Sequence, residues 1–143
     1  MGKLITENGK YLLLFILLTA ITFSCDEIES QVPEVPVNFT ISLDLFNELQ
    51  NPGSSVYFPK AGFGGVIVSC HVVGEYYAYD ATCTHEISQS CHLTPDGLLA
   101  TCPCCESQYS LFYTASPISG PASAPLKQYN VSFLGGNTLR IYN

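Results

Sequence analysis

Five cysteines and two histidines lie between Asp80 and Gln108, and this cluster constrains the chain more than any other feature. Thiolates and imidazoles that converge from two loops are the ligands of soft and borderline metal ions. Cys83-Thr84-His85 and Cys102-Pro103-Cys104-Cys105 each supply a close pair of such groups. The residues between the two pairs are numerous enough to bring the second loop back beside the first. The cluster therefore predicts a metal site built from Cys83, His85, Cys102 and Cys105.

Residues 1–24 have the pattern of a signal peptide. Lys3 and Lys10 precede an apolar run over 11–23 that is too short to span a bilayer comfortably. The run ends in TFSC, which resembles the lipobox of bacterial lipoproteins, although its phenylalanine is a departure. We expect Cys25 to be lipidated and the protein to be exported and anchored at a bacterial membrane, periplasmic or surface-exposed. The alternative is an uncleaved membrane anchor followed by an ordinary cysteine.

Export leaves a second interpretation of the cysteine cluster open. Cys25 accounts for one of the seven cysteines, and the six others of an exported small domain would ordinarily form three disulfides. The cysteines would then only join loops together.

Length and charge exclude several classes of function. A chain of 143 residues holds one small domain and no second catalytic domain. A net charge of -7 would repel a phosphate backbone, so we expect no nucleic-acid binding. No catalytic base, nucleophile or substrate pocket is discernible, so a non-catalytic protein is favoured over an enzyme.

The pattern after the signal peptide indicates a tether followed by an all-β domain. Residues 25–36 are acidic and contain prolines, which is typical of a linker, and the domain is expected over 37–143. Strict alternation from Val37 to Leu45 predicts a strand, with a turn near 45–50. Further short strands are predicted at 56–58, 65–73, 75–80, 108–113, 126–133 and 138–142. These elements predict an antiparallel β-sandwich or small barrel.

Three further cysteine and histidine side chains are not expected to be metal ligands. Cys70 alternates with valines and is expected to be a buried free thiol. His71, on the same predicted strand, is expected on its solvated face. His92 could replace Cys105 as a ligand only if the first loop folded back, which we do not expect.

From about Gly65 to the C-terminus, the chain resembles the Rieske [2Fe-2S] family. The family pattern is C-x-H, a spacer, and C-P-C-H-G-S with an aromatic residue shortly after. Here YAYDATC leads into Cys83-Thr84-His85, and Cys102-Pro103-Cys104 begins the second loop. The resemblance implies a cluster-binding subdomain with loops at about 81–110. It also implies that the hydroxyls of Ser107 and Tyr109 point toward the cluster sulfurs.

Two departures from the family pattern change what the resemblance implies. Cys105 stands in place of the second ligand histidine, so a [2Fe-2S] cluster would be held by three cysteines and His85. The first-loop cysteine that the family pairs with the equivalent of Cys104 is displaced to Cys91, and a Cys91–Cys104 disulfide remains compatible with the pattern.

The implied function is electron transfer or redox sensing with an unknown partner protein. A thiolate in place of an imidazole is expected to lower the reduction potential, since histidine ligation is what raises Rieske potentials above those of all-cysteine clusters. Two alternatives stay open. One is a cluster-free surface domain joined by disulfides, for example between Cys102 and Cys105, and the other is a structural Zn²⁺ site with the same Cys₃His ligands.

Overall fold

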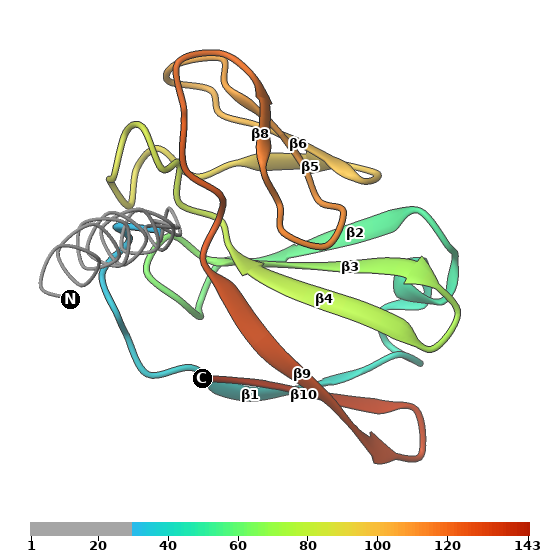
Figure 1. Cartoon of the computed structure of the whole chain (residues 1–143). Coiled ribbons are helices and arrows are strands. Elements are labelled where there is room, and N and C mark those ends of the chain that lie inside the picture. Colours follow the sequence, from blue (N-terminus) through green and yellow to red (C-terminus); the bar gives the residue numbers. More distant parts are fainter. Residues whose placement is uncertain (1–29) are drawn as a thin grey trace, which may run out of the picture.

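The computed structural model describes residues 30–143, so the predicted signal peptide and Cys25 lie outside the described part. The described chain forms two antiparallel sheets (Figure 1). The larger has the strand order β1-β10-β9-β4-β3-β2, and the smaller has the order β5-β6-β7-β8. The elements are β1 (Asn38–Ser42), the 3₁₀ helix η1 (Asn47–Gln50), β2 (Ser54–Phe58), β3 (Val66–Val72), β4 (Glu75–Asp80), β5 (Thr94–Asp96), β6 (Leu99–Thr101), β7 (Gln108–Ser110), β8 (Pro117–Ser119), β9 (Gln128–Gly135) and β10 (Thr138–Tyr142).

The all-β antiparallel class is confirmed, but the first strand is shorter than the alternation predicts. β1 ends at Ser42, whose carbonyl accepts hydrogen bonds from the backbone N–H groups of Leu45 and Phe46. Because of this turn Leu45 lies outside the sheet, and its side chain is 80% exposed. The turn continues into η1, whose Leu49 is fully buried.

The larger sheet opens between β4 and β9. These strands pair through Ala78↔Tyr129 and Tyr79↔Gln128 only, after which β9 turns away with β10 (Figure 1). The smaller sheet lies above the larger sheet in the same view. The chain leaves β4 for the smaller sheet and returns along 120–127 to β9.

The two sheets have separate apolar cores that share β3. Its alternate side chains point to opposite faces, with Val66 and Val68 in the core of the larger sheet and Ile67 in the core beneath the smaller sheet. The second core also contains Cys83, Cys102 and Tyr109. Two of the predicted ligands are therefore held in packed apolar surroundings.

Burial of both faces of β3 makes one prediction wrong and confirms another. His71 is only 7% exposed and does not lie on a solvated face. It stacks between the rings of Tyr77 and Phe112, and its Nε2 lies 2.7 Å from the carbonyl oxygen of Leu111. The alternation suggested a solvated face because it does not show that a second sheet covers it. Cys70 is buried and has a free thiol, as expected.

Residues 30–36, which belong to the predicted tether, contact the domain. Val32 is buried, and Glu34 forms an ion pair with Lys127 at 3.8 Å. The side-chain amide of Asn143 donates a hydrogen bond to the carbonyl of Val35. None of the helices within residues 30–143 has the length and apolarity to cross a membrane.

Candidate metal centre

The first loop leaves β4 along a backbone that is fixed on both sides. The N–H of Ala81 donates to the carbonyl of Gly65, and the N–H of Leu93 donates to the carbonyl of Ala81. Thr82 forms an isolated bridge with His92, so the loop returns beside its own start. Cys83 follows directly and is completely buried.

The second loop connects β6 to β7 and forms a tight turn. The N–H of Cys102 donates to the carbonyl of Ser107, and the N–H of Glu106 donates back to the carbonyl of Cys102. Glu106 adopts a left-handed conformation with φ of 59°. This turn places Cys102 and Cys105 on the side that faces Cys83.

Three thiols from the two loops meet in one place, which we call the thiol trio: Cys83, Cys102 and Cys105. Their Sγ atoms all lie within 4.8 Å of one another, and those of Cys83 and Cys105 are 3.5 Å apart. Cys83 and Cys102 are buried, whereas Cys105 is partly exposed. Three of the four predicted ligands are thus brought together.

A disulfide between Cys91 and Cys104 joins the same two loops. Its sequence separation of 13 residues closes a short loop, for which cross-linking stabilises a folded chain by about 3 kcal/mol. It ties the segment before His92 to the residue next to Cys105. The remaining cysteines in the described part of the chain are free thiols.

The phenol of Tyr109 lies against the first loop. Its Oη is 3.6 Å from Cys83 Sγ, and it accepts a hydrogen bond of 3.1 Å from the N–H of Thr84. The hydroxyl of Thr84 donates to the carbonyl of Ala124, so its oxygen, 2.8 Å from Tyr109 Oη, is free to accept. Tyr109 therefore has a proton to donate either to Thr84 or to the sulfur of Cys83.

Ser107 plays the equivalent part for Cys105. Its Oγ is 3.1 Å from Cys105 Sγ and accepts a hydrogen bond from the N–H of Ala122 at 3.0 Å. Gly120 packs so closely that a Cβ there would lie 2.5 Å from Ser107 Cα. The segment that returns to the larger sheet therefore fixes the position of Ser107. Both hydroxyls implied by the resemblance lie beside trio sulfurs.

The surroundings act on two of the thiols in opposite directions. Burial raises the pKa of Cys102 to about 11, although hydrogen bonds from the backbone of Cys105 and Cys104 oppose this rise. For Cys105, burial also raises the pKa, but hydrogen bonds from the side chain and backbone of Ser107, and from Cys83 and Cys102, outweigh it and lower the pKa overall. Of these two thiols, Cys105 is the one whose thiolate is favoured.

Neither histidine of the cluster belongs to the group of ligand atoms that lie within 4.8 Å of one another. His85 follows Cys83 by two residues, is exposed, and is not among the ligand atoms within 4.8 Å of one another. His92 stacks on Tyr57, with ring centroids 5.1 Å apart and planes 2° from parallel. His92 is thus accounted for by packing.

One comparison with a solved structure identifies the fold. A chain in the complex of reduced oxygenase and oxidized ferredoxin in carbazole 1,9a-dioxygenase matches with a TM-score of 0.52 and 23% identity, over 74% of this chain and 93% of that one. This chain has a Rieske-like fold. The ferredoxin of carbazole 1,9a-dioxygenase from Nocardioides aromaticivorans IC177 matches with a TM-score of 0.48, at 22% identity over 76% of this chain and 97% of that one. The Sphingomonas yanoikuyae B1 ferredoxin gives 0.45, at 22% identity over 65% and 88%.

No protein-family model matches the sequence, and the search of curated proteins gives no match. The comparisons therefore establish the Rieske-like architecture and leave the ligands to be argued from the residues themselves.

Asp80 fixes the start of the first loop in the Rieske-like domain, and the sequence pattern did not predict this role. This fully buried carboxylate accepts hydrogen bonds from the N–H groups of Phe63, Gly64 and Thr82 and from the hydroxyls of Thr82 and Tyr129. These donors surround both oxygens, as a buried carboxylate requires. The hint in the sequence was an acidic residue directly after the apolar stretch Tyr76–Tyr79.

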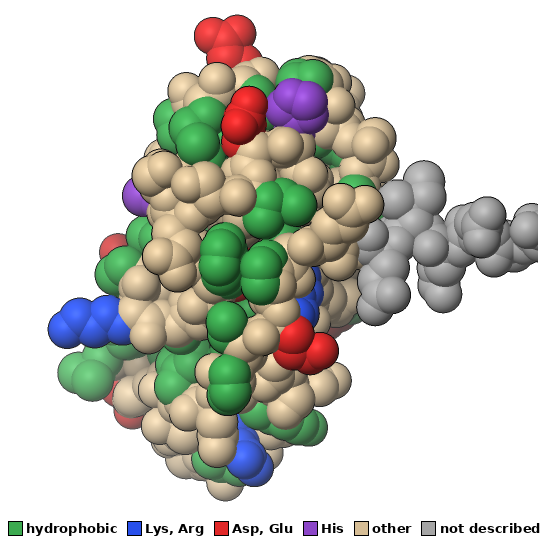
Figure 2. All heavy atoms as spheres, turned by 90° about the vertical axis from the view of Figure 1, so that its left-hand side faces the viewer, with side chains coloured by type: hydrophobic (Ala, Val, Ile, Leu, Met, Phe, Trp, Pro, Cys, Tyr) green, Lys and Arg blue, Asp and Glu red, His purple; other side chains and the backbone are tan. Residues whose placement is uncertain are grey.

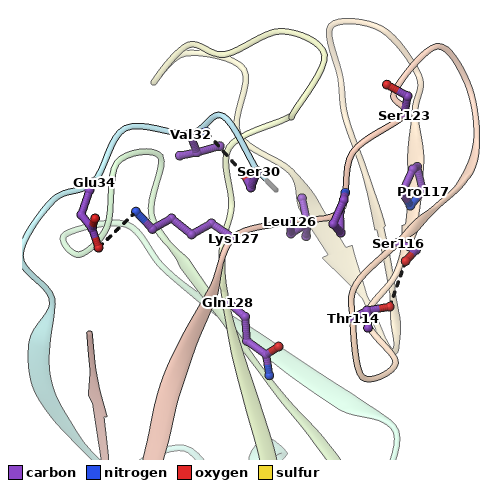
Figure 3. A pocket seen from close by; sticks show the side chains of 11 residues that line it. Ser30, Val32, Glu34, Thr114, Ser116, Pro117, Ser123, Leu126, Lys127 and Gln128 are labelled. Carbon is purple, nitrogen blue, oxygen red and sulfur yellow. Dashed lines mark hydrogen bonds and ion pairs between the residues drawn. The ribbon is translucent and has the colours of Figure 1, made fainter. Parts of the chain in front are cut away.

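The Rieske-like domain exposes its metal-site loops at one end. Glu86, which follows His85 in the chain, and Glu106, which follows Cys105, are exposed, and acidic and histidine side chains appear at the upper end of the face in Figure 2. A hollow of about 1180 Å³ lies elsewhere, between residues 30–34 and 114–128. Glu34 and Lys127, which form an ion pair, are among the residues that line it (Figure 3), and no cysteine lines it. The trio is therefore reached through the loops and not through this hollow.

Proposed function

We propose that this protein is a membrane-anchored Rieske-like electron-transfer or redox-sensing protein that holds a [2Fe-2S] cluster through Cys83, Cys102, Cys105 and His85. The observation that carries the proposal is the thiol trio, with sulfurs from two loops within 4.8 Å. Sulfur donors of this kind fit an iron–sulfur group, which supplies one-electron chemistry when bound. His85 is the fourth ligand that the sequence offers on the same loop.

The chain's own residues would protect and tune such a group. Cys83 and Cys102 are buried in the apolar core beneath the smaller sheet, which keeps water from their sulfurs. The hydroxyls of Tyr109 and Ser107 lie beside Cys83 and Cys105, where O–H donors reduce the negative charge on a thiolate. The disulfide between the two loops limits how far they can separate.

The ligand set determines the expected reduction potential. Neutral imidazoles raise Rieske potentials to roughly -150 to +300 mV, against about -400 mV for plant-type clusters with four thiolates. Cys105 adds one negative charge to both redox states, which disfavours the reduced state more. The potential is expected between these two ranges, with hydrogen bonds from Ser107 and Tyr109 raising it and Glu106 lowering it.

A protein partner would supply or accept the electron. The first structural neighbour comes from a complex of an oxygenase with a ferredoxin, and by analogy we propose a redox partner protein here. The exposed loop end that carries His85 and the acidic residues is the region through which such a partner would approach. Lipidation at Cys25, which lies outside the described residues, would hold the pair at the membrane.

The proposal is tested by a redox titration of the purified protein followed by optical and electron paramagnetic resonance spectroscopy. A one-electron transition between the two potential ranges, with one ligand protonation assigned to His85, is expected. Two coupled ligand protonations, as from two histidines, would contradict the Cys₃His ligand set.

Structural zinc is the second candidate, and the closeness of Cys83 to Cys105 favours it. Two thiolates bound to one tetrahedral Zn²⁺ at about 2.3 Å lie about 3.8 Å apart, and the Sγ atoms of these residues are 3.5 Å apart. His85 would complete a closed Cys₃His site. Metal analysis of the protein separates this candidate from the cluster.

A further inference from the structure

A close approach between two free thiols joins the two loops. The Sγ atoms of Cys83 and Cys105 are 3.5 Å apart, and neither residue belongs to the disulfide. Cys83 is buried, whereas Cys105 is partly exposed. One thiol is thus reachable by a solute, and a second lies directly behind it.

We propose that Cys83 and Cys105 form a thiol–disulfide exchange site, which oxidises reversibly to a Cys83–Cys105 disulfide. Cys105 is the residue that reacts with an external disulfide, and Cys83 is the residue that completes the exchange. The external reactant belongs to the class of low-molecular-weight or protein disulfides. This activity is separate from electron transfer and requires no metal.

The exchange has two steps. The thiolate of Cys105 attacks one sulfur of the external disulfide, so that a mixed disulfide forms and the first thiolate leaves. The thiolate of Cys83 then attacks Cys105 Sγ, so that the Cys83–Cys105 bond forms and the second thiolate leaves. Two protein thiols are oxidised, one external disulfide is reduced to two thiols, and the protons of Cys83 and Cys105 pass to the leaving groups. A dithiol reverses the reaction.

Contacts around the pair support this division of roles. Ser107 Oγ lies 3.1 Å from Cys105 Sγ and is itself held by the N–H of Ala122, so it can orient the sulfur and donate to its thiolate. Cys102 lies within 4.8 Å of both other sulfurs but is completely buried.

The exchange would control metal loading, and this consequence rests on the proposed function. Metal ligation requires thiolates, so the disulfide removes two of the three trio ligands at once. Oxidation and metal binding therefore exclude each other, and an oxidised chain must be reduced before it can be loaded.

The test uses the purified protein after treatment with a chelator and a mild reductant, with glutathione and glutathione disulfide as the redox buffer. Thiols are then alkylated and the linkages mapped by mass spectrometry. Oxidation is expected to remove two free thiols and to link Cys83 to Cys105. Cys83→Ser should stop at a glutathione adduct on Cys105, and Cys102→Ser, the matched control, should still form the linkage.

A Cys102–Cys105 linkage, an adduct on Cys102, or no loss of free thiols would overturn the proposal. Circular dichroism checks that each variant is folded, and if Cys83→Ser is not, the linkage in the unsubstituted protein decides. Iron, zinc and sulfide are measured before chelation. If no cluster is found but oxidation forms the Cys83–Cys105 linkage, the proposed function alone is refuted. If a cluster is found but the linkage does not form, the exchange site alone is refuted.

Discussion

The hydroxyl of Tyr109 lies 3.6 Å from the sulfur of Cys83 and has one proton, which it can donate to that sulfur or to the hydroxyl oxygen of Thr84. Burial raises the pKa of Tyr109 far above its ordinary value, so the phenol stays protonated and remains a donor. This relationship links a residue of β7 to the first metal-site loop. The Tyr109 hydroxyl would therefore affect the reduction potential of a bound cluster, and it can be removed by substitution without altering a ligand.

Tyr109→Phe is expected to lower the reduction potential of the loaded protein. Loss of a hydrogen bond worth about 1 kcal/mol in favour of the reduced state corresponds to about 40 mV for a one-electron couple. Redox titration measures the change. Tyr57→Phe is the matched control, because the Tyr57 hydroxyl donates to the carbonyl of Gly64 and not to a trio sulfur. Equal potentials for Tyr109→Phe and the unsubstituted protein would show that the hydroxyl does not act on the cluster.

Cys105→His is expected to raise the potential by an amount on the order of 100 mV, because a neutral imidazole replaces a thiolate. The same substitution should add a second ligand protonation to the pH dependence of the potential. Cys105→Ala serves as the comparison and should lose the cluster. A potential that Cys105→His leaves unchanged would mean that residue 105 is not a ligand.

Two glycines with the same backbone conformation allow the packing against Ser107 to be measured. Gly120 and Gly135 have φ values of 86° and 88°, but only at Gly120 would a Cβ collide with a neighbour. Gly135→Ala is expected to cost about 1 kcal/mol of unfolding free energy from backbone strain alone. Gly120→Ala is expected to cost about 3 kcal/mol and to displace Ser107 from Cys105. Urea denaturation measures both, and equal costs would contradict the close packing.

Two buried phenols predict a loss of stability in alkali. Burial raises the pKa of Tyr79, and burial together with a hydrogen bond to Asp80 raises that of Tyr129. The unfolded chain releases these protons near pH 10 whereas the folded chain retains them, so stability is complete below about pH 10 and falls above it. Each group contributes a slope of about 1.4 kcal/mol per pH unit.

Urea denaturation at about pH 8 and about pH 11 measures this loss. Tyr79→Phe should be less stable at the lower pH, because its hydroxyl donates to the carbonyl of Tyr113, but should lose less stability between the two. A pH dependence identical to that of the unsubstituted protein would place the Tyr79 phenol outside the titration.

Strands with a clear alternation could be predicted from the sequence, and the shortest ones could not. Residues 138–142 and 75–80 were predicted with the bounds that the structure has. β5, β6 and β8 have three residues each, which is too few for a period of two to be recognised. In the smaller sheet each of them pairs with a strand that comes next to it along the chain.

The site shows a similar division. The resemblance to Rieske proteins implied the Cys91–Cys104 disulfide and the positions of Ser107 and Tyr109, and the structure contains these contacts. Spacing could not show that the sulfur of Cys105 lies 3.5 Å from that of Cys83 or that His85 is exposed. These positions depend on how two loops fold against each other, and a pattern along one loop does not report them.

Iron, zinc and acid-labile sulfide, measured in the protein purified from its native source without reduction, test the central claim most directly. We predict about two irons and two sulfides per chain, which Cys105→Ala loses. Zinc without sulfide, or no metal with the trio thiols oxidised, would contradict the claim that this Rieske-like domain carries an electron-transfer cluster.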